Sequence, residues 1–163
     1  MSNRRRPRAV LRAALLSLAA VGVAATAAEA QSTDALEGVW SADRYLLAEG
    51  SGHEVEGRIF FTGGHWQVLF FVMDGAGVAR RGSGEGGTYQ RTADGVVFSH
   101  LFHLSIGDAM PGLAEAPLRM VVQAPEEAPL EPTRVDVDDA ILTLRFPSGN
   151  RMTFTRAGPL PRG

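Results

Sequence analysis

Apolar and polar residues alternate most clearly along residues 96–105, and this pattern predicts a β-strand with two distinct faces. The more apolar and aromatic face carries Val96, Phe98, His100, Phe102 and Leu104. Side chains on a strand point alternately to its two sides, so we expect this set to face the interior. His100 would then lie among apolar neighbours, and His103 would point to the opposite face.

Residues 86–91 precede this strand and are predicted to pair with it. The two are separated by residues 92–95, which end in Asp94-Gly95. An Asp-Gly pair is a strong hairpin signal, because the tight turn needs a positive φ that glycine adopts without steric cost. We therefore expect an antiparallel hairpin at the centre of the fold.

A second hairpin is predicted from residues 58–62 and 66–72, with Gly63, Gly64 and His65 in the turn. One face of its second strand carries Trp66, Val68, Phe70 and Val72. Leu69 and Phe71, on the other face, are apolar as well. We expect a loop, a neighbouring subunit or the twist of a barrel to cover that face.

The rest of the chain continues in short segments of the same kind. Further strands are predicted from 36 to 47 and at 118–123, 134–137, 140–146 and 151–156, with loops at 48–56, 73–84, 106–117 and 124–133. About eight to ten short strands with frequent turn signals, and no convincing amphipathic helix, are typical of an antiparallel sandwich or barrel. The short turns favour an up-and-down β-barrel, which either is filled by side chains or holds one small ligand.

The first 30 residues are expected to be a signal peptide rather than part of this fold. Five arginines are followed by an apolar, alanine-rich stretch at 13–28, and Ala28-Glu29-Ala30 fits the small-x-small pattern before a cleavage site. The apolar stretch is too short for a comfortable membrane span. We therefore expect one domain at residues 31–163, located in the periplasm or secreted, and no stable membrane insertion.

Composition excludes several classes of function. The chain has no cysteine, so disulfides and thiolate metal sites are unavailable to it. After removal of residues 1–30, 11 arginines and no lysine would stand against 17 acidic residues. A mildly acidic domain without a basic stripe is a poor candidate for binding nucleic acid.

The chain contains Gly-Val-Trp at 38–40, Gly-Thr-Tyr at 87–89, the Asp94-Gly95 turn with the following strand and its His100, and the closing segments 142–144, 149–150 and 152–156. Together these short motifs resemble those of the lipocalins and the wider calycin group. The resemblance implies a barrel that binds a small apolar molecule. It also implies that Trp40 packs across the closed end beneath Arg156, or beneath Arg151 in another register. Many lipocalins carry a disulfide, which this chain cannot form.

His100 is the most informative candidate residue. It could anchor the polar end of a ligand inside an apolar cavity. It could equally be a packed histidine whose hydrogen bonds are satisfied by Tyr89 or a backbone carbonyl. A haem role would have to use His100, because no histidine follows His103. The histidines show no metal-ligand spacing, and we predict no metal and no cofactor.

Our leading prediction is an exported barrel that binds a small apolar ligand. The predicted ligand-binding residues are His100, Tyr89, Phe98, Phe102, Trp66, Phe70 and Met120. One alternative is an enzyme of the isomerase or cyclase type, with His100 transferring protons beside Glu85, Tyr89 or Arg119. Another is a filled barrel that binds a protein partner, for example as a homodimer through Leu69 and Phe71. Arg119 faces solvent if Met120 faces inward, and enters the cavity if the register slips by one residue.

Overall fold

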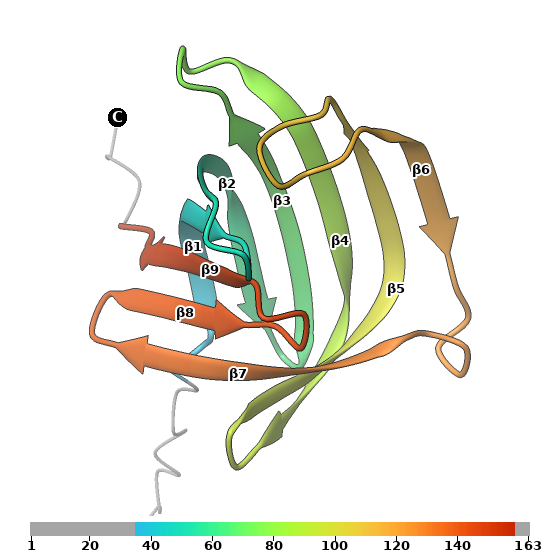
Figure 1. Cartoon of the computed structure of the whole chain (residues 1–163). Coiled ribbons are helices and arrows are strands. Elements are labelled where there is room, and N and C mark those ends of the chain that lie inside the picture. The colour runs from blue at the N-terminus through green and yellow to red at the C-terminus, as the bar shows by residue number, and fades with distance from the viewer. Residues whose placement is uncertain (1–34, 159–163) are drawn as a thin grey trace, which may run out of the picture. The chain divides into compact units, whose positions relative to one another are not determined.

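The computed structural model describes residues 35–158, and these form a closed antiparallel β-barrel (Figure 1). The strands of the described residues are β1 (Gly38–Leu46), β2 (Gly52–Thr62), β3 (His65–Met73), β4 (Ala79–Thr92), β5 (Gly95–Gly107), β6 (Ala116–Val122), β7 (Leu130–Asp138), β8 (Ile141–Arg145) and β9 (Arg151–Arg156). The predicted all-β, antiparallel up-and-down barrel is confirmed. The predicted signal peptide lies outside the described residues.

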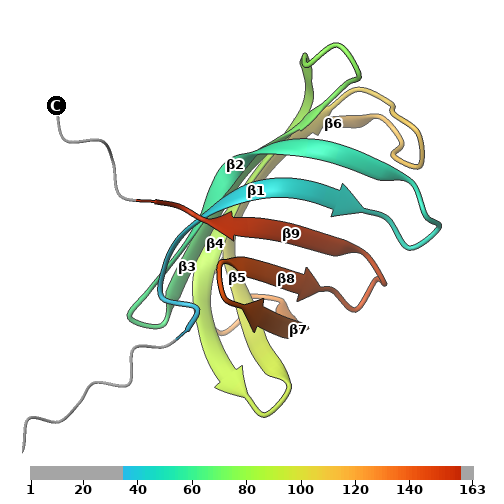
Figure 2. The same ribbon diagram turned by 90° about the vertical axis from the view of Figure 1, so that its left-hand side faces the viewer.

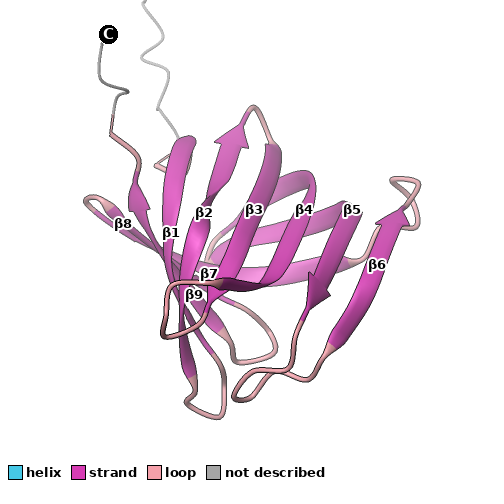
Figure 3. Ribbon diagram, turned by 90° about the horizontal axis from the view of Figure 1, so that it is seen from above, coloured by secondary structure: helices cyan, strands magenta, loops and turns pink. Residues whose placement is uncertain are grey.

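The barrel closes because each strand pairs with its neighbour along the chain, except at one place. β1 to β5 form a meander, β7 to β9 continue it, and β9 pairs with β1 (Figure 2). β5 is the exception: its residues 95–99 pair with β7, whereas residues 102–107 pair with β6. β6 therefore lies beside β5 as an added strand outside the closed barrel, as the view from above shows (Figure 3).

Three predicted loops are shorter than expected, because strands begin inside them. β2 begins at Gly52, β4 at Ala79 and β7 at Leu130. In β4, Gly84 pairs with Leu69 of β3 and Gly82 pairs with Phe71. A glycine in a strand leaves room for the large side chain beside it, so a glycine-rich segment here forms a regular ladder rather than a loop.

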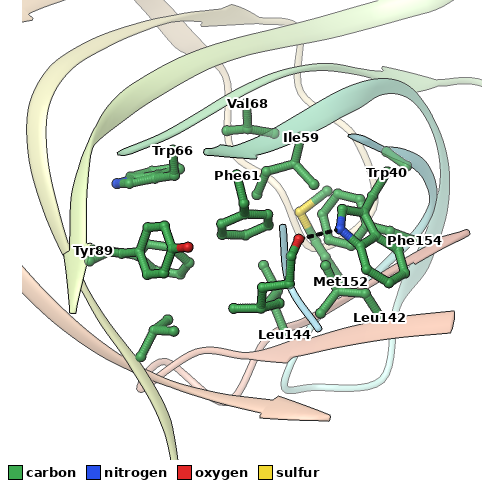
Figure 4. Close-up of a cluster of buried hydrophobic side chains, with 14 of the residues drawn as sticks. Trp40, Ile59, Phe61, Trp66, Val68, Tyr89, Leu142, Leu144, Met152 and Phe154 are labelled. Atoms are coloured by element: carbon green, nitrogen blue, oxygen red, sulfur yellow. Dashed lines mark hydrogen bonds between the residues drawn. The ribbon is translucent and has the colours of Figure 1, made fainter. Parts of the chain in front are cut away.

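The core is packed most densely at the end of the barrel where Trp40 lies. Trp40, Phe61, Phe98 and Phe154 are at most 1% exposed, and side chains from β1, β2, β8 and β9 converge there (Figure 4). The indole Nε1 of Trp40 donates a hydrogen bond of 2.9 Å to the carbonyl oxygen of Leu36. The guanidinium of Arg156 lies 4.0 Å from the centre of the Trp40 ring. The expected contact between Trp40 and Arg156 is thus confirmed, and it closes this end.

Arg156 also ties down the chain that enters β1. Its guanidinium donates hydrogen bonds to the carbonyl oxygens of Glu37 and Ala35, at 3.0 and 2.6 Å. The segment before β1 is therefore held across the barrel end, where it covers the indole. This arrangement keeps the closed end dry and leaves the opposite half of the barrel as the place for a cavity.

Candidate functional site

A cavity of about 200 Å3 lies inside the barrel, above the packed closed end. Its lining residues come from eight strands and the loop after β8: Tyr45, Ile59, Trp66, Val68, Phe70, Glu85, Phe98, His100, Glu131, Leu144, Phe146, Ser148, Asn150, Met152 and Phe154. Most of the wall is aliphatic or aromatic. The charged groups gather on one side, where β4, β5 and β7 meet.

An irregularity in β5 adds His103 to these charged groups. Gly86 pairs with Phe102 and Gly87 with His100, so Leu101 is an extra residue on β5. Such a bulge reverses the alternation of faces beyond it. A Cβ atom on Gly87 would lie 1.9 Å from the carbonyl oxygen of Ser99. The close approach of β4 to the bulge therefore depends on glycine at this position.

The bulge corrects two predictions about β5 and one about β6. His100 and His103 lie on the same face rather than on opposite faces, because both contact Glu85. Phe102 lies outside the barrel and is 39% exposed, and Met120 of β6, which pairs with the exposed Leu104, is also outward and is 69% exposed. The predicted positions of Phe102 and Met120 in the cavity are therefore wrong.

The remaining predicted site residues divide into two groups. Trp66, Phe70, Phe98 and His100 line the cavity, as expected. Tyr89 is buried in the core and meets Phe61 edge to face, with 5.4 Å between the ring centres, and does not line the cavity. Tyr89 is consequently part of the packing rather than the polar end of the site.

His100 lies between two carboxylates. Its Nδ1 is 2.9 Å from Oε2 of Glu85, and its Nε2 is 3.3 Å from Oε2 of Glu131. The imidazole also meets the indole of Trp66 edge to face, with 5.1 Å between the ring centres. Both ring nitrogens of His100 are therefore occupied by acceptors, a geometry that suits the doubly protonated ring.

The two carboxylates govern the protonation state of His100. Burial by itself lowers the pKa of this imidazole, but the hydrogen bonds to Glu131 and Glu85 outweigh that effect and raise the pKa to about 9. Burial also raises the pKa of Glu85, but the hydrogen bond from His100 and the nearby charge of His103 leave that pKa below its usual value. At neutral pH the centre of the site is thus an imidazolium between two carboxylates.

Further polar groups extend this network along β4 and β5. The hydroxyl of Ser83 donates to Oε1 of Glu85 at 3.1 Å. Nδ1 of His103 lies 3.3 Å from the same oxygen, and its Nε2 lies 2.8 Å from the hydroxyl oxygen of Ser105. We call Glu85, His100 and Glu131 the charged triad, since these three also line the cavity.

Two members of the charged triad, His100 and Glu131, line both the cavity and a groove on the outside of the barrel. The groove lies between β5, β6 and β7, and its lining includes His100, His103, Arg119 and Glu131. Met120 points outward, so the register is the alternative one, but Arg119 lines the groove and does not enter the cavity as that alternative predicted.

Sequence reasoning missed Glu131 and the residues at the other end of the cavity. The sequence pattern predicts a loop at residues 124–133, which includes Glu131. In the structure Glu131 belongs to β7 and lies on the same inner side of this strand as Thr133, Val135 and Val137. Extending the predicted strand backwards by that alternation would have found it. Tyr45 and Asn150, whose Nδ2 donates to the Tyr45 hydroxyl at 2.7 Å, meet only through the fold and gave no local signal.

Among residues 35–158, no group of three His, Cys, Asp or Glu side chains is arranged to hold a metal ion. The same residues include no helix with the length and apolar character needed to cross a membrane. Comparisons with known protein families, curated proteins and solved structures found no match to this chain. Function must therefore be argued from the cavity and the charged triad.

Proposed function

We propose that this protein is an exported, lipocalin-like barrel that binds a small, mainly apolar ligand in its cavity. The observation that carries the proposal is a cavity of about 200 Å3 with apolar walls and a charged triad on one side. Binding sites for small molecules usually combine such walls with a few polar groups that orient the ligand. The contact between Trp40 and Arg156 agrees with the lipocalin resemblance.

The size of the cavity limits the ligand to a small molecule. An apolar cavity of about 150 Å3 in another protein holds one benzene molecule. A ligand with one aromatic ring, or with a short branched chain, therefore fits the volume available between Phe70, Phe98 and Met152. Larger lipids would need the cavity to open toward the groove.

Binding of fluorobenzene, followed by 19F NMR, tests this proposal independently of any polar group on the ligand. Phe70 and Phe71 are neighbours on β3 and point respectively into the cavity and to the outer surface. Phe70→Trp should fill the cavity and abolish binding, whereas Phe71→Trp adds the same volume outside and should leave binding unchanged. Thermal unfolding of both variants checks that each is folded.

The proposal fails if fluorobenzene does not bind the wild-type protein, or if both tryptophan variants bind it equally well. Native mass spectrometry of the protein expressed from its full-length sequence adds a second readout. A small molecule that is lost on denaturation, and is absent from Phe70→Trp but present in Phe71→Trp, would identify the natural ligand.

The enzyme alternative has weaker support from the geometry. A general base must offer an unprotonated nitrogen to the substrate. Both nitrogens of His100 lie against carboxylates, and those contacts raise its pKa to about 9. The ring is therefore protonated and fully engaged at neutral pH, which suits a positioning role better than proton abstraction.

A second proposal concerns the outer face of β3, β5 and β6, which we infer to be the contact between two copies of this chain. Its exposed apolar residues are Leu69, Phe71, Phe102, Leu104, Ile106, Leu118, Met120 and Val122. Within the described residues β6 pairs on one side only, so an open backbone edge borders this face. An open edge with apolar neighbours favours pairing with an identical edge in a two-fold dimer.

Sedimentation velocity measures this association directly. We expect the wild-type protein to be a dimer and Phe71→Asp to be a monomer. Ile141→Asp, at an exposed apolar position on β8, is the matched control and should remain dimeric. A monomeric wild-type protein, or a dimer that survives Phe71→Asp, would refute the proposal.

A further inference from the structure

The chemical character of the ligand can be inferred from the charges in the cavity, and this step rests on the proposed binding function. The chain has no lysine, and no arginine from residues 35–158 lines the cavity. The charged lining residues are Glu85, Glu131 and His100. Even with both His100 and His103 protonated, two carboxylates make the site no more than neutral. A ligand carboxylate would therefore enter without a countercharge.

The hydrogen-bonding groups of the site also disfavour a ligand carboxylate. The two N–H groups of His100 are taken up by Glu85 and Glu131. Oε1 of Glu131 has no hydrogen-bond partner among the described residues, whereas both carboxylate oxygens of Glu85 are contacted. The site thus offers a free anionic acceptor and no free cationic donor, and a ligand group that donates hydrogen bonds matches it.

The aromatic walls of the cavity also favour a positively charged group on the ligand. Tyr45, Trp66, Phe70, Phe98 and Phe146 place aromatic rings around the cavity. The faces of such rings attract cations, most strongly where water is excluded. The charges of the two carboxylates also act on Tyr45. Burial raises the pKa of the Tyr45 hydroxyl most, and the negative charges of Glu85 and Glu131 raise it further.

We propose that the ligand is a small apolar amine, bound as the ammonium ion, whose charged end lies against Glu131 beside the imidazolium of His100. Its apolar part, one ring or a short chain, occupies the aromatic end of the cavity. Glu131 provides the free acceptor, Glu85 keeps His100 protonated and in place, and His100 prevents the two carboxylates from repelling each other. The triad then acts as an amine-selective polar end.

Three probes that share one phenyl ring separate this inference from the general binding function. They are 2-phenylethylamine, 2-phenylethanol and 3-phenylpropanoate, titrated near pH 7 by calorimetry. We expect the amine to bind roughly tenfold or more tighter than the alcohol, since hydrogen bonds to ionised partners are about twice as strong as neutral ones. The carboxylate should show no measurable binding.

Glu131→Gln tests the residue that carries the inference. This change keeps the shape and the acceptor oxygen but removes the charge, so amine affinity should fall roughly tenfold while alcohol affinity changes little. Glu127→Gln removes one negative charge from an exposed loop residue and should leave all three affinities unchanged. Thermal unfolding checks that both variants are folded.

The outcomes separate the two claims. If fluorobenzene binds but the alcohol or the carboxylate binds as tightly as the amine, the inference about the amine is wrong and the binding function stands. If the amine binds best but Glu131→Gln leaves its affinity unchanged, the assignment to Glu131 is wrong. If neither fluorobenzene nor any of the three probes binds, both claims fail.

Discussion

The same strands build both halves of the barrel, but the side chains that point inward differ between the closed half and the open half. In the closed half, around Trp40 and Phe154, the side chains that point inward are apolar. In the open half, beyond Leu101, the bulge in β5 turns His103 inward and Phe102 outward. The closed half therefore provides stability, while the half with the broken register provides the charged groups on which a function can depend.

The largest expected effect is the loss of the indole at the closed end. Trp40→Ala should lower the free energy of unfolding by about 3–5 kcal/mol, the usual cost of removing a large buried aromatic side chain. Phe102→Ala, on the outer face of the open half, should cost about 0.5 kcal/mol or little more. Urea denaturation measures both. Similar losses for the two variants would contradict the division between the halves.

A change in pH should affect the open half alone. Because the pKa of folded His100 is about 9 against the ordinary value of 6.5 for histidine, its contribution is complete below pH 6.5 and is lost as the pH rises through 9. The groups that face it are Glu85, Glu131 and the ring of Trp66. The loss is at most about 3 kcal/mol.

Urea denaturation at about pH 6 and about pH 10 measures this loss, with His100→Gln as the comparison variant. The wild-type protein should lose more stability between the two pH values than the variant does. An identical pH dependence in both would show that the carboxylates do not hold the imidazolium as the structure indicates.

The bulge itself can be tested at two glycines of β4. A Cβ atom at Gly87 would lie 1.9 Å from the carbonyl oxygen of Ser99, whereas one at Gly84 would make an ordinary contact of 3.6 Å with Leu69. Gly87→Ala should destabilise the protein by about 1–3 kcal/mol through overpacking. Gly84→Ala should be neutral or stabilise it by up to about 1 kcal/mol. Thermal unfolding compares them, and equal effects would refute the role assigned to Gly87.

The smallest expected effect concerns the contact between Arg156 and Trp40 at the closed end. Arg156→Met keeps an apolar stem over Trp40 but removes the guanidinium, which should cost about 1 kcal/mol or more from the lost cation–π contact and the lost hydrogen bonds to Glu37 and Ala35. Arg151→Met, on the same strand but away from the indole, is the control. A blue or red shift of the Trp40 fluorescence should accompany only the first change. Equal stability losses without such a shift would argue against the stacking.

Much of the barrel could be predicted because its signals are local. The turn at Asp94-Gly95 and the alternation of Trp66, Val68 and Phe70 depend on residues next to each other in the chain, and both appear in the structure as predicted. The charged triad could not be predicted in the same way. Glu85, His100 and Glu131 lie on three different strands, and only the pairing of β5 with both β4 and β7 brings them together.

The sequence by itself determined most of the strands, most of their turns and the barrel class, and the resemblance to lipocalins implied the packing of Trp40 beneath Arg156. Those features follow from side-chain alternation, turn chemistry and short motifs, all of which can be recognised without knowing what lies opposite. Only the tertiary structure decided which face of residues 102–106 points inward. That choice depends on one extra residue at Leu101, and whether a strand accommodates an extra residue is set by the neighbouring strand, here by the glycines of β4.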